Sequence, residues 1–331
     1  MPPKNTVIRA VSSLLVAAAA FLALPVQAEG LDAWQDGPAR QQILDFIGAV
    51  SREGGPDYVP PAERIAVFDN DGTLWSEKPV YAQLAFAVDR IRAMAGDHPE
   101  FATDEPWKFA VAGDLPGLMG TGKQGMAQIM AASHTGMNSD AFDQTVADWI
   151  ASARHPVTDR PYTAMTYLPM QQLMSLLRDN GFQVYIVSGG GVAFIRAWSE
   201  DTYGVPPQNV IGTSLKLDLQ GQGADAQLIR TAELEFYDDG PGKVVGIEKQ
   251  IGRRPIAAFG NSDGDIEMLD WVASGPGPRL AVLLHHDDDA REVAYDRDSA
   301  FGRLDQGLER AKSSGWLVVS MARDWLQVFA E

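Results

Sequence analysis

Two carboxylates stand one residue apart at the end of an apolar segment, and this spacing suits metal-assisted chemistry. Residues 65–68 (Ile-Ala-Val-Phe) read as a short buried strand that ends at Asp69 and Asp71. Gly72 permits a sharp turn of the backbone, and Thr73 adds a hydroxyl beside the acids. Carboxylates held this close repel unless a cation or a shared proton relieves them, so we expect a hard ion such as Mg²⁺. The alternative is an acidic turn that caps a hairpin.

Two later segments carry polar residues with related potential. Ser188 ends an apolar run and precedes three glycines, so its hydroxyl and the backbone N–H of Gly189 could hold an oxyanion. Lys243 follows Gly-Pro-Gly at the start of a predicted helix and could neutralise developing negative charge. Lys249 competes for this role, but it lies deeper in the helix and is expected to point away from the strand ends. Without ligands, these features would be a glycine-rich turn and a surface lysine.

In this order, the segments resemble the four motifs of the haloacid dehalogenase (HAD) superfamily of phosphohydrolases. The matching segments are 65–75, 184–191, Lys243 and 259–269. The resemblance implies that Asp69 is the nucleophile that forms an aspartyl-phosphate. It implies that Asp71 is the general acid and base, and that Ser188, Gly189 and Lys243 bind the phosphoryl group. Displacement of halide needs no proton and the dehalogenases lack the second acid, so Asp71 favours phosphoryl transfer.

The fourth segment departs from the commoner family pattern. Residues 260–265 read Gly-Asn-Ser-Asp-Gly-Asp, so Asn261 stands where many relatives carry a metal-binding Asp. The expected metal ligands are Asp69, Asp71, Asn261 and Asp265, with Asp263 as an alternative third ligand. A neutral amide attracts a cation less than a carboxylate does, so Asn261→Asp is expected to tighten Mg²⁺ binding unless the added charge crowds its neighbours.

The remaining pattern predicts an α/β fold. Apolar strands expected at 182–187, 209–214, 255–259, 279–284 and 316–320 alternate with helices. This order predicts a doubly wound, parallel, Rossmann-like HAD core over residues 29–75 and 166–331. Residues 76–165 show helical patterns and are expected to form an inserted α-helical cap, as in the phosphoserine-phosphatase-like branch. Residues 215–229 are expected to form a small hairpin or flap.

The first 28 residues are expected to be a signal peptide. Lys4 and Arg9 precede an apolar run at 11–24 that is short for a membrane span. Val-Gln-Ala at 26–28 is an acceptable cleavage site, which predicts a periplasmic or secreted protein without stable membrane insertion after cleavage. The chain has no Cys, which excludes disulfides and thiol chemistry.

The formal net charge of −17 disfavours partners that are themselves anionic. Nucleic acid and anionic lipid surfaces are repelled, and an anionic substrate needs a local positive field. The acidic run at 285–289 (His-His-Asp-Asp-Asp) could hold a metal, but adjacent strand residues point to opposite faces, so a solvated loop is favoured.

The expected function is an exported Mg²⁺-dependent phosphomonoesterase that acts on a small phosphate ester through an aspartyl-phosphate. One alternative is a phosphotransferase to an alcohol acceptor. Another, suggested by Asn261, is a catalytically weak periplasmic protein that binds phosphate esters.

Overall fold

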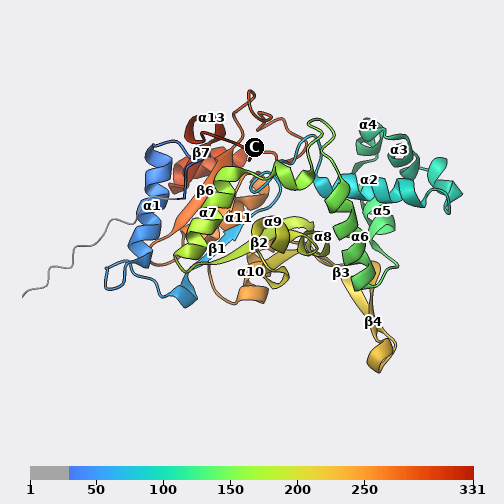
Figure 1. Cartoon of the computed structure of the whole chain (residues 1–331), viewed down its shortest axis with the longest axis horizontal. Coiled ribbons are helices and arrows are strands. Elements are labelled where there is room, and N and C mark those ends of the chain that lie inside the picture. Colours follow the sequence, from blue (N-terminus) through green and yellow to red (C-terminus); the bar gives the residue numbers. More distant parts are fainter. Residues whose placement is uncertain (1–29) are drawn as a thin grey trace, which may run out of the picture.

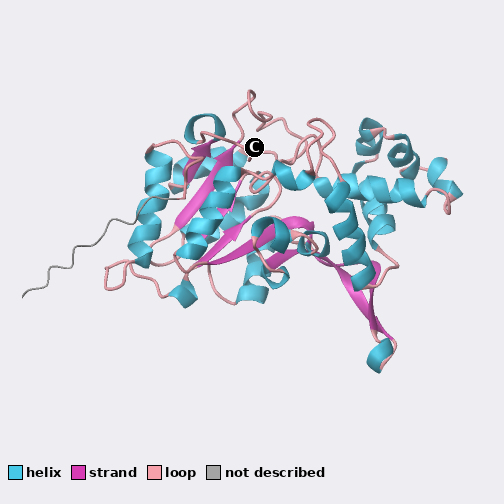
Figure 2. Cartoon of the chain, in the orientation of Figure 1, coloured by secondary structure: helices cyan, strands magenta, loops and turns pink. Residues whose placement is uncertain are grey.

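A seven-stranded sheet forms the core of the computed structural model, which describes residues 30–331. The expected signal peptide lies outside the described residues. The strand order is β4-β3-β2-β1-β5-β6-β7, and every neighbouring pair is parallel except β3 and β4 (Figures 1 and 2). The strands are β1 (Ile65–Phe68), β2 (Gln183–Gly191), β3 (Val210–Gln220), β4 (Gln227–Phe236), β5 (Ala257–Gly260), β6 (Leu280–His285) and β7 (Leu317–Ser320).

Helices cover both faces of this sheet, which explains why its strands are continuous apolar runs. Ala66 and Phe68 of β1 pack with α1 (Pro38–Ser51) and α7 (Leu168–Asp179). Ile65 and Val67 point to the other face and pack with α10 (Pro241–Ile251), α11 (Ile266–Ala273) and α12 (Gln306–Ser314). The predicted doubly wound core is therefore confirmed. The shorter helices α8 (Val192–Arg196), α9 (Ser199–Tyr203) and α13 (Met321–Asp324) complete it.

The helical cap lies between β1 and β2 in the chain and to one side of the sheet (Figure 1). Its helices are α2 (Ala82–Met94), α3 (Trp107–Ala112), α4 (Leu115–Gly120), α5 (Gly122–His134) and α6 (Ser139–Ser152). These helices bury a separate apolar cluster that includes Leu84, Ile91 and Ile129. Helix α6 is capped by Asn138, whose Oδ1 accepts from Ala141 N at 2.8 Å.

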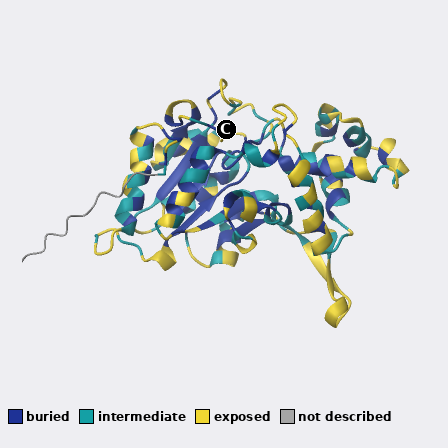
Figure 3. Cartoon of the chain, viewed as in Figure 1, coloured by how far each residue is buried: buried dark blue, intermediate teal, exposed yellow. Residues whose placement is uncertain are grey.

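The predicted small hairpin is longer than the sequence indicated. Strands β3 and β4 run antiparallel and project from the core as an arm (residues 214–236) that is largely exposed at its end (Figure 3). Leu219 and Leu228 face each other near the tip and are 69% and 44% exposed. Nearer the core, the arm pairs with the cap, because Arg230 N donates to Met137 O and Gly136 N donates to Arg230 O, both at 3.0 Å. None of the helices within residues 30–331 has the length and apolar character needed to cross a membrane.

Candidate active site

The carboxyl ends of three adjacent strands bring the predicted residues to one edge of the sheet. Phe68 is in register with Ile186 of β2 and Phe259 of β5, so the residues that follow these positions emerge side by side. Asp69 N donates to Phe259 O at 2.9 Å and fixes the start of the first acidic loop. Asp69, Ser188 and Asn261 thus gather where open α/β sheets bind their ligands.

Lys243 joins two buried carboxylates at the centre of this site. Its Nζ donates to Asp69 Oδ1 and to Asp265 Oδ1, each at 2.6 Å, and its side chain is 3% exposed. Burial opposes the ammonium charge, but Asp265 and Asp69 outweigh it and raise the pKa of Lys243. Burial and then Asp265 raise the pKa of Asp69 to about 8, against the opposing effect of Lys243. The site therefore holds more acidic groups than its single lysine can balance.

The side chains of Asp265 and Asp263 make hydrogen bonds within the protein that compete with binding of a metal ion. Oδ2 of Asp265 accepts from the backbone N–H groups of Asn261 and Ser262, each at 3.0 Å, while Oδ1 accepts from Lys243. The contacts of Asp265 thus anchor Lys243 and order the loop, so the metal role expected for it loses support. Oδ1 of Asp263 accepts from the backbone of residues 305 and 307, at the start of α12.

Asp71 faces the cavity from the other side of the acidic loop. Its Oδ1 accepts from Trp75 Nε1 at 2.8 Å, which fixes the carboxyl group beside the site. Burial is the main cause that raises the pKa of Asp71 above the usual range of an aspartate. A raised pKa suits a carboxyl group that must donate a proton.

A cavity of about 420 Å³ lies between these residues and the cap. The core lines it with Asp69, Asp71, Ser188, Gly189, Lys243 and others. The cap contributes Tyr81, Gln83, Leu84, Met126 and Met130. Ser188 is buried, and its Oγ accepts from Gly190 N at 3.1 Å. Cap and core thus enclose a small polar chamber with an apolar side wall.

Glu77 is a site residue that sequence reasoning missed. It lines the cavity although it is 1% exposed, and its Oε1 lies 3.0 Å from Asn261 Nδ2. Burial, with smaller effects from the charges of Asp71 and Asp69, raises the pKa of Glu77 to about 8, against the opposing effects of the Tyr295 hydroxyl and Lys78. No local pattern separates Glu77 from a surface acid, because its partners come from distant segments.

The two histidines at the end of β6 lie on opposite sides, as expected. His286 is buried, and its Nε2 lies 2.7 Å from Gly72 O, so it supports the turn beneath Asp71. His285 is partly exposed and lies 3.8 Å from Asp287 and 3.7 Å from Asp296. These contacts make His286 a support for the acidic loop.

The oxygen-rich donor set fits a hard cation only with help from neutral ligands. Within residues 30–331, no three acidic or histidine side chains are arranged so that they could hold a metal ion by themselves. Asp69 and Asn261 are nevertheless joined by Thr73, whose Oγ1 lies 3.3 Å from Asp69 Oδ2 and 3.1 Å from Asn261 Oδ1, and Asp71 lines the same cavity as Asp69. The charge of Asp265 adds to burial in raising the pKa of Asp69, and a cation would relieve this repulsion. An amide, backbone carbonyls and water would complete the coordination.

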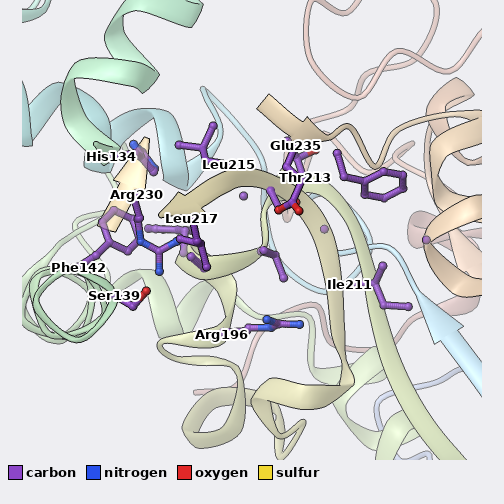
Figure 4. A pocket seen from close by; sticks show the side chains of 18 of the residues that line it. His134, Ser139, Phe142, Arg196, Ile211, Thr213, Leu215, Leu217, Arg230 and Glu235 are labelled. Atoms are coloured by element: carbon purple, nitrogen blue, oxygen red, sulfur yellow. The ribbon is translucent and has the colours of Figure 1, made fainter. Parts of the chain in front are cut away.

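A second pocket, of about 680 Å³, adjoins the site on the side of the arm (Figure 4). His134, Phe142, Arg196 and Arg230 line it, and Figure 4 shows them around the space beneath the arm. Lys249, the alternative to Lys243, lines this pocket and packs over the Phe236 ring at 4.5 Å. Gln83 Nε2 and His134 Nε2, 3.0 Å apart, link the walls of the two pockets.

Known proteins resemble this chain in sequence pattern and in fold. The family model of haloacid dehalogenase-like hydrolases matches residues 66–270, more than half of the chain. A conserved protein of unknown function from Anaerococcus prevotii DSM 20548 has a similar structure, with a TM-score of 0.51 and 16% identity over 75% of this chain and 86% of that chain. A protein of unknown function from Bordetella pertussis Tohama I gives a TM-score of 0.48 and 16% identity over 78% and 98% of the respective chains.

A probable phosphoserine phosphatase from Vibrio cholerae gives a TM-score of 0.35 and 16% identity, over 78% of this chain and 67% of that chain. No protein of curated function matches the sequence significantly. The residues that the family model matches include the polar residues of all four segments, of which Lys243 is one. The core sheet holds these segments at one edge. The chain therefore belongs to the haloacid dehalogenase-like hydrolases.

Proposed function

We propose that this hydrolase is a Mg²⁺-dependent phosphomonoesterase that acts on a small phosphate ester. The observation that carries the proposal is the cluster of Asp69, Asp71 and Lys243 around one cavity. Lys243 gives a phosphate oxyanion a buried positive charge within a chain whose formal charge is −17. A cation held by Asp69, Asp71 and Asn261 would supply further charge neutralisation to the phosphoryl oxygens.

In the first step, an oxygen of Asp69 attacks phosphorus, and the bond from phosphorus to the ester oxygen breaks. Asp71 gives its proton to the departing alkoxide, which leaves as an alcohol. Lys243, the Ser188 hydroxyl and the backbone N–H of Gly189 hold the phosphoryl oxygens. The enzyme then carries an aspartyl-phosphate.

In the second step, Asp71 takes a proton from water, and the water oxygen attacks phosphorus. The bond between phosphorus and Asp69 breaks and releases inorganic phosphate, so both carboxyl groups return to their starting state. A phosphotransferase would use an alcohol in place of water. The volume of about 420 Å³ and the apolar cap residues Leu84, Met126 and Met130 favour a small substrate with an apolar portion.

We also propose that the protein is exported, which rests on the basic and apolar pattern of residues 1–28. Fractionation of cells that produce the full chain, with mass spectrometry of the mature N-terminus, tests this. Cleavage after Ala28 is expected, and retention of the leader in the soluble cytoplasmic fraction would refute it.

The test of the mechanism is Asp69→Asn, measured on a panel of phosphate esters with and without Mg²⁺. Turnover should fall by about a thousandfold or more, since the amide cannot form the phosphoenzyme. The exposed Asp57→Asn is the matched control and should be unaffected. Loss of less than about tenfold, which is roughly 1.4 kcal/mol, would rule out Asp69 as nucleophile. Full activity after verified metal removal would rule out the metal requirement, and a phosphorylated alcohol in the products would identify a transferase.

A further inference from the structure

We infer that Glu77 positions Asn261 and supplies the negative charge that Asn261 lacks. This inference rests on the proposed function, because it concerns the cation site of the same cavity. Asn261 is a neutral residue at the place where an acid would attract a cation more strongly. The carboxylate that contacts its amide nitrogen belongs to Glu77, 184 positions away in the sequence.

Hydrogen bonds around Asn261 determine which way its amide faces. Glu77 Oε1 already accepts from the Tyr295 hydroxyl, and Asn261 presents its NH₂ group to the same oxygen, at 3.0 Å. Its Oδ1 then lies on the opposite side, where Thr73 Oγ1 donates to it at 3.1 Å. The same Thr73 hydroxyl lies 3.3 Å from Asp69 Oδ2. Glu77 therefore keeps the acceptor oxygen of Asn261 on the side of Asp69.

The surroundings of Glu77 are shaped to hold its carboxylate. The Tyr295 hydroxyl donates to the same Oε1 at 2.5 Å. A Cβ at Gly72 would lie 2.5 Å from this oxygen, and one at Gly302 would lie 1.7 Å from it. Both glycines have positive φ, 77° and 59°, which other residues rarely adopt. The space that holds the Glu77 carboxyl group thus exists only because residues 72 and 302 are glycines. An acid at a solvated surface has no such enclosure.

A carboxylate behind a ligand can act on the cation without touching it. Groups that hydrogen-bond to a ligand orient it and raise its basicity, and their loss costs about 10–100-fold in metal affinity. A bound cation favours the ionised form of a neighbouring carboxyl group. With the cation in place, Glu77 would therefore set one negative charge next to the neutral ligand Asn261 instead of on the ligand itself. A carboxylate at both positions would set two acids about 3 Å apart, which is unfavourable.

The test is a double-mutant cycle of Glu77→Gln, Asn261→Asp and the pair, read by Mg²⁺ titration calorimetry and by melting of the metal-free protein. Glu77→Gln should weaken Mg²⁺ binding by about tenfold or more, because the shape remains and the charge is lost. Asn261→Asp alone should destabilise the metal-free protein and bring no gain in affinity. In the Glu77→Gln background, Asn261→Asp should restore Mg²⁺ binding. Glu248→Gln, on the exposed side of α10, is the matched control.

Three results would overturn the inference. They are unchanged affinity in Glu77→Gln, equal effects of Asn261→Asp in both backgrounds, and a gain of tenfold or more from Asn261→Asp alone. The last applies even if Glu77→Gln fails to fold. If the unaltered protein binds no Mg²⁺, both the inference and the proposed metal dependence fail. If it binds Mg²⁺ and Glu77→Gln binds it equally well, only the inference fails.

Discussion

Replacement of Lys243 by Met should cost more stability than any other single lysine change in this region. The ammonium is the shared partner of Asp69 and Asp265, at 2.6 Å from each, and those two residues are 6% and 0% exposed. Removing one partner of a buried ion pair costs about 3–5 kcal/mol, because the remaining charge is left buried and unpaired. Two carboxylates lose their partner here, so the upper part of this range is expected. The total free energy of unfolding of a native protein is only about 5–15 kcal/mol.

Urea denaturation at neutral pH in the presence of a chelator measures this cost without compensation by a cation. Lys249→Met is the matched control, since Lys249 lies on the same helix, is exposed and packs over the face of Phe236. It should lose no more than about 1 kcal/mol. Adding Asp265→Asn to Lys243→Met should recover part of the loss, because one unpaired charge disappears. A loss of less than about 1 kcal/mol in Lys243→Met would show that the two carboxylates do not depend on this lysine.

Two further predictions concern stability. Burial, together with the charges of Arg230 and Arg90, lowers the pKa of His134 to about 3. Between about pH 3 and pH 6.5, the folded protein therefore binds fewer protons than the unfolded chain, in which His titrates near 6.5. Stability should fall by up to about 1.4 kcal/mol per pH unit on acidification through this window, and this slope should lessen in His134→Gln when urea midpoints are compared from pH 7 to pH 4. Gly72→Ala should cost about 1–3 kcal/mol more than Gly54→Ala in the same assay. The two glycines have φ of 77° and 76°, but a Cβ at Gly72 meets Asn261 Nδ2 at 2.0 Å, whereas Gly54 faces open space, so equal losses would contradict the close packing at Glu77.

The sequence predicted the gathering of the polar segments because each follows a buried strand. Asp69 and Asn261 follow the ends of β1 and β5, and Ser188 lies in β2 just beyond the residues that pair with β1. Parallel strands bring such residues to one edge of the sheet. Lys243 could be preferred to Lys249 from its place at the start of the helix. Glu77 could not be found in this way, because its role depends on a loop that folds back toward Asn261 and on glycines at 72 and 302.

The length of the β3–β4 arm was also beyond sequence reasoning. Leu217 and Leu219 alternate with polar residues as in a strand with one apolar face, yet both are exposed. Alternation indicates a face, but it does not tell whether another element covers that face.

The pairing between the cap and the arm has a mechanical consequence. Strand β3 begins inside the core sheet and continues into the arm, and β4 is bonded to the cap at residues 136 and 137. Any swing of the cap away from the catalytic edge must either bend this strand or break the two backbone bonds at Arg230. The arm and its two bonds to the cap therefore oppose movement of the cap away from this edge of the sheet. Hydrogen exchange of the amide protons of Gly136 and Arg230 would report how often these two bonds open.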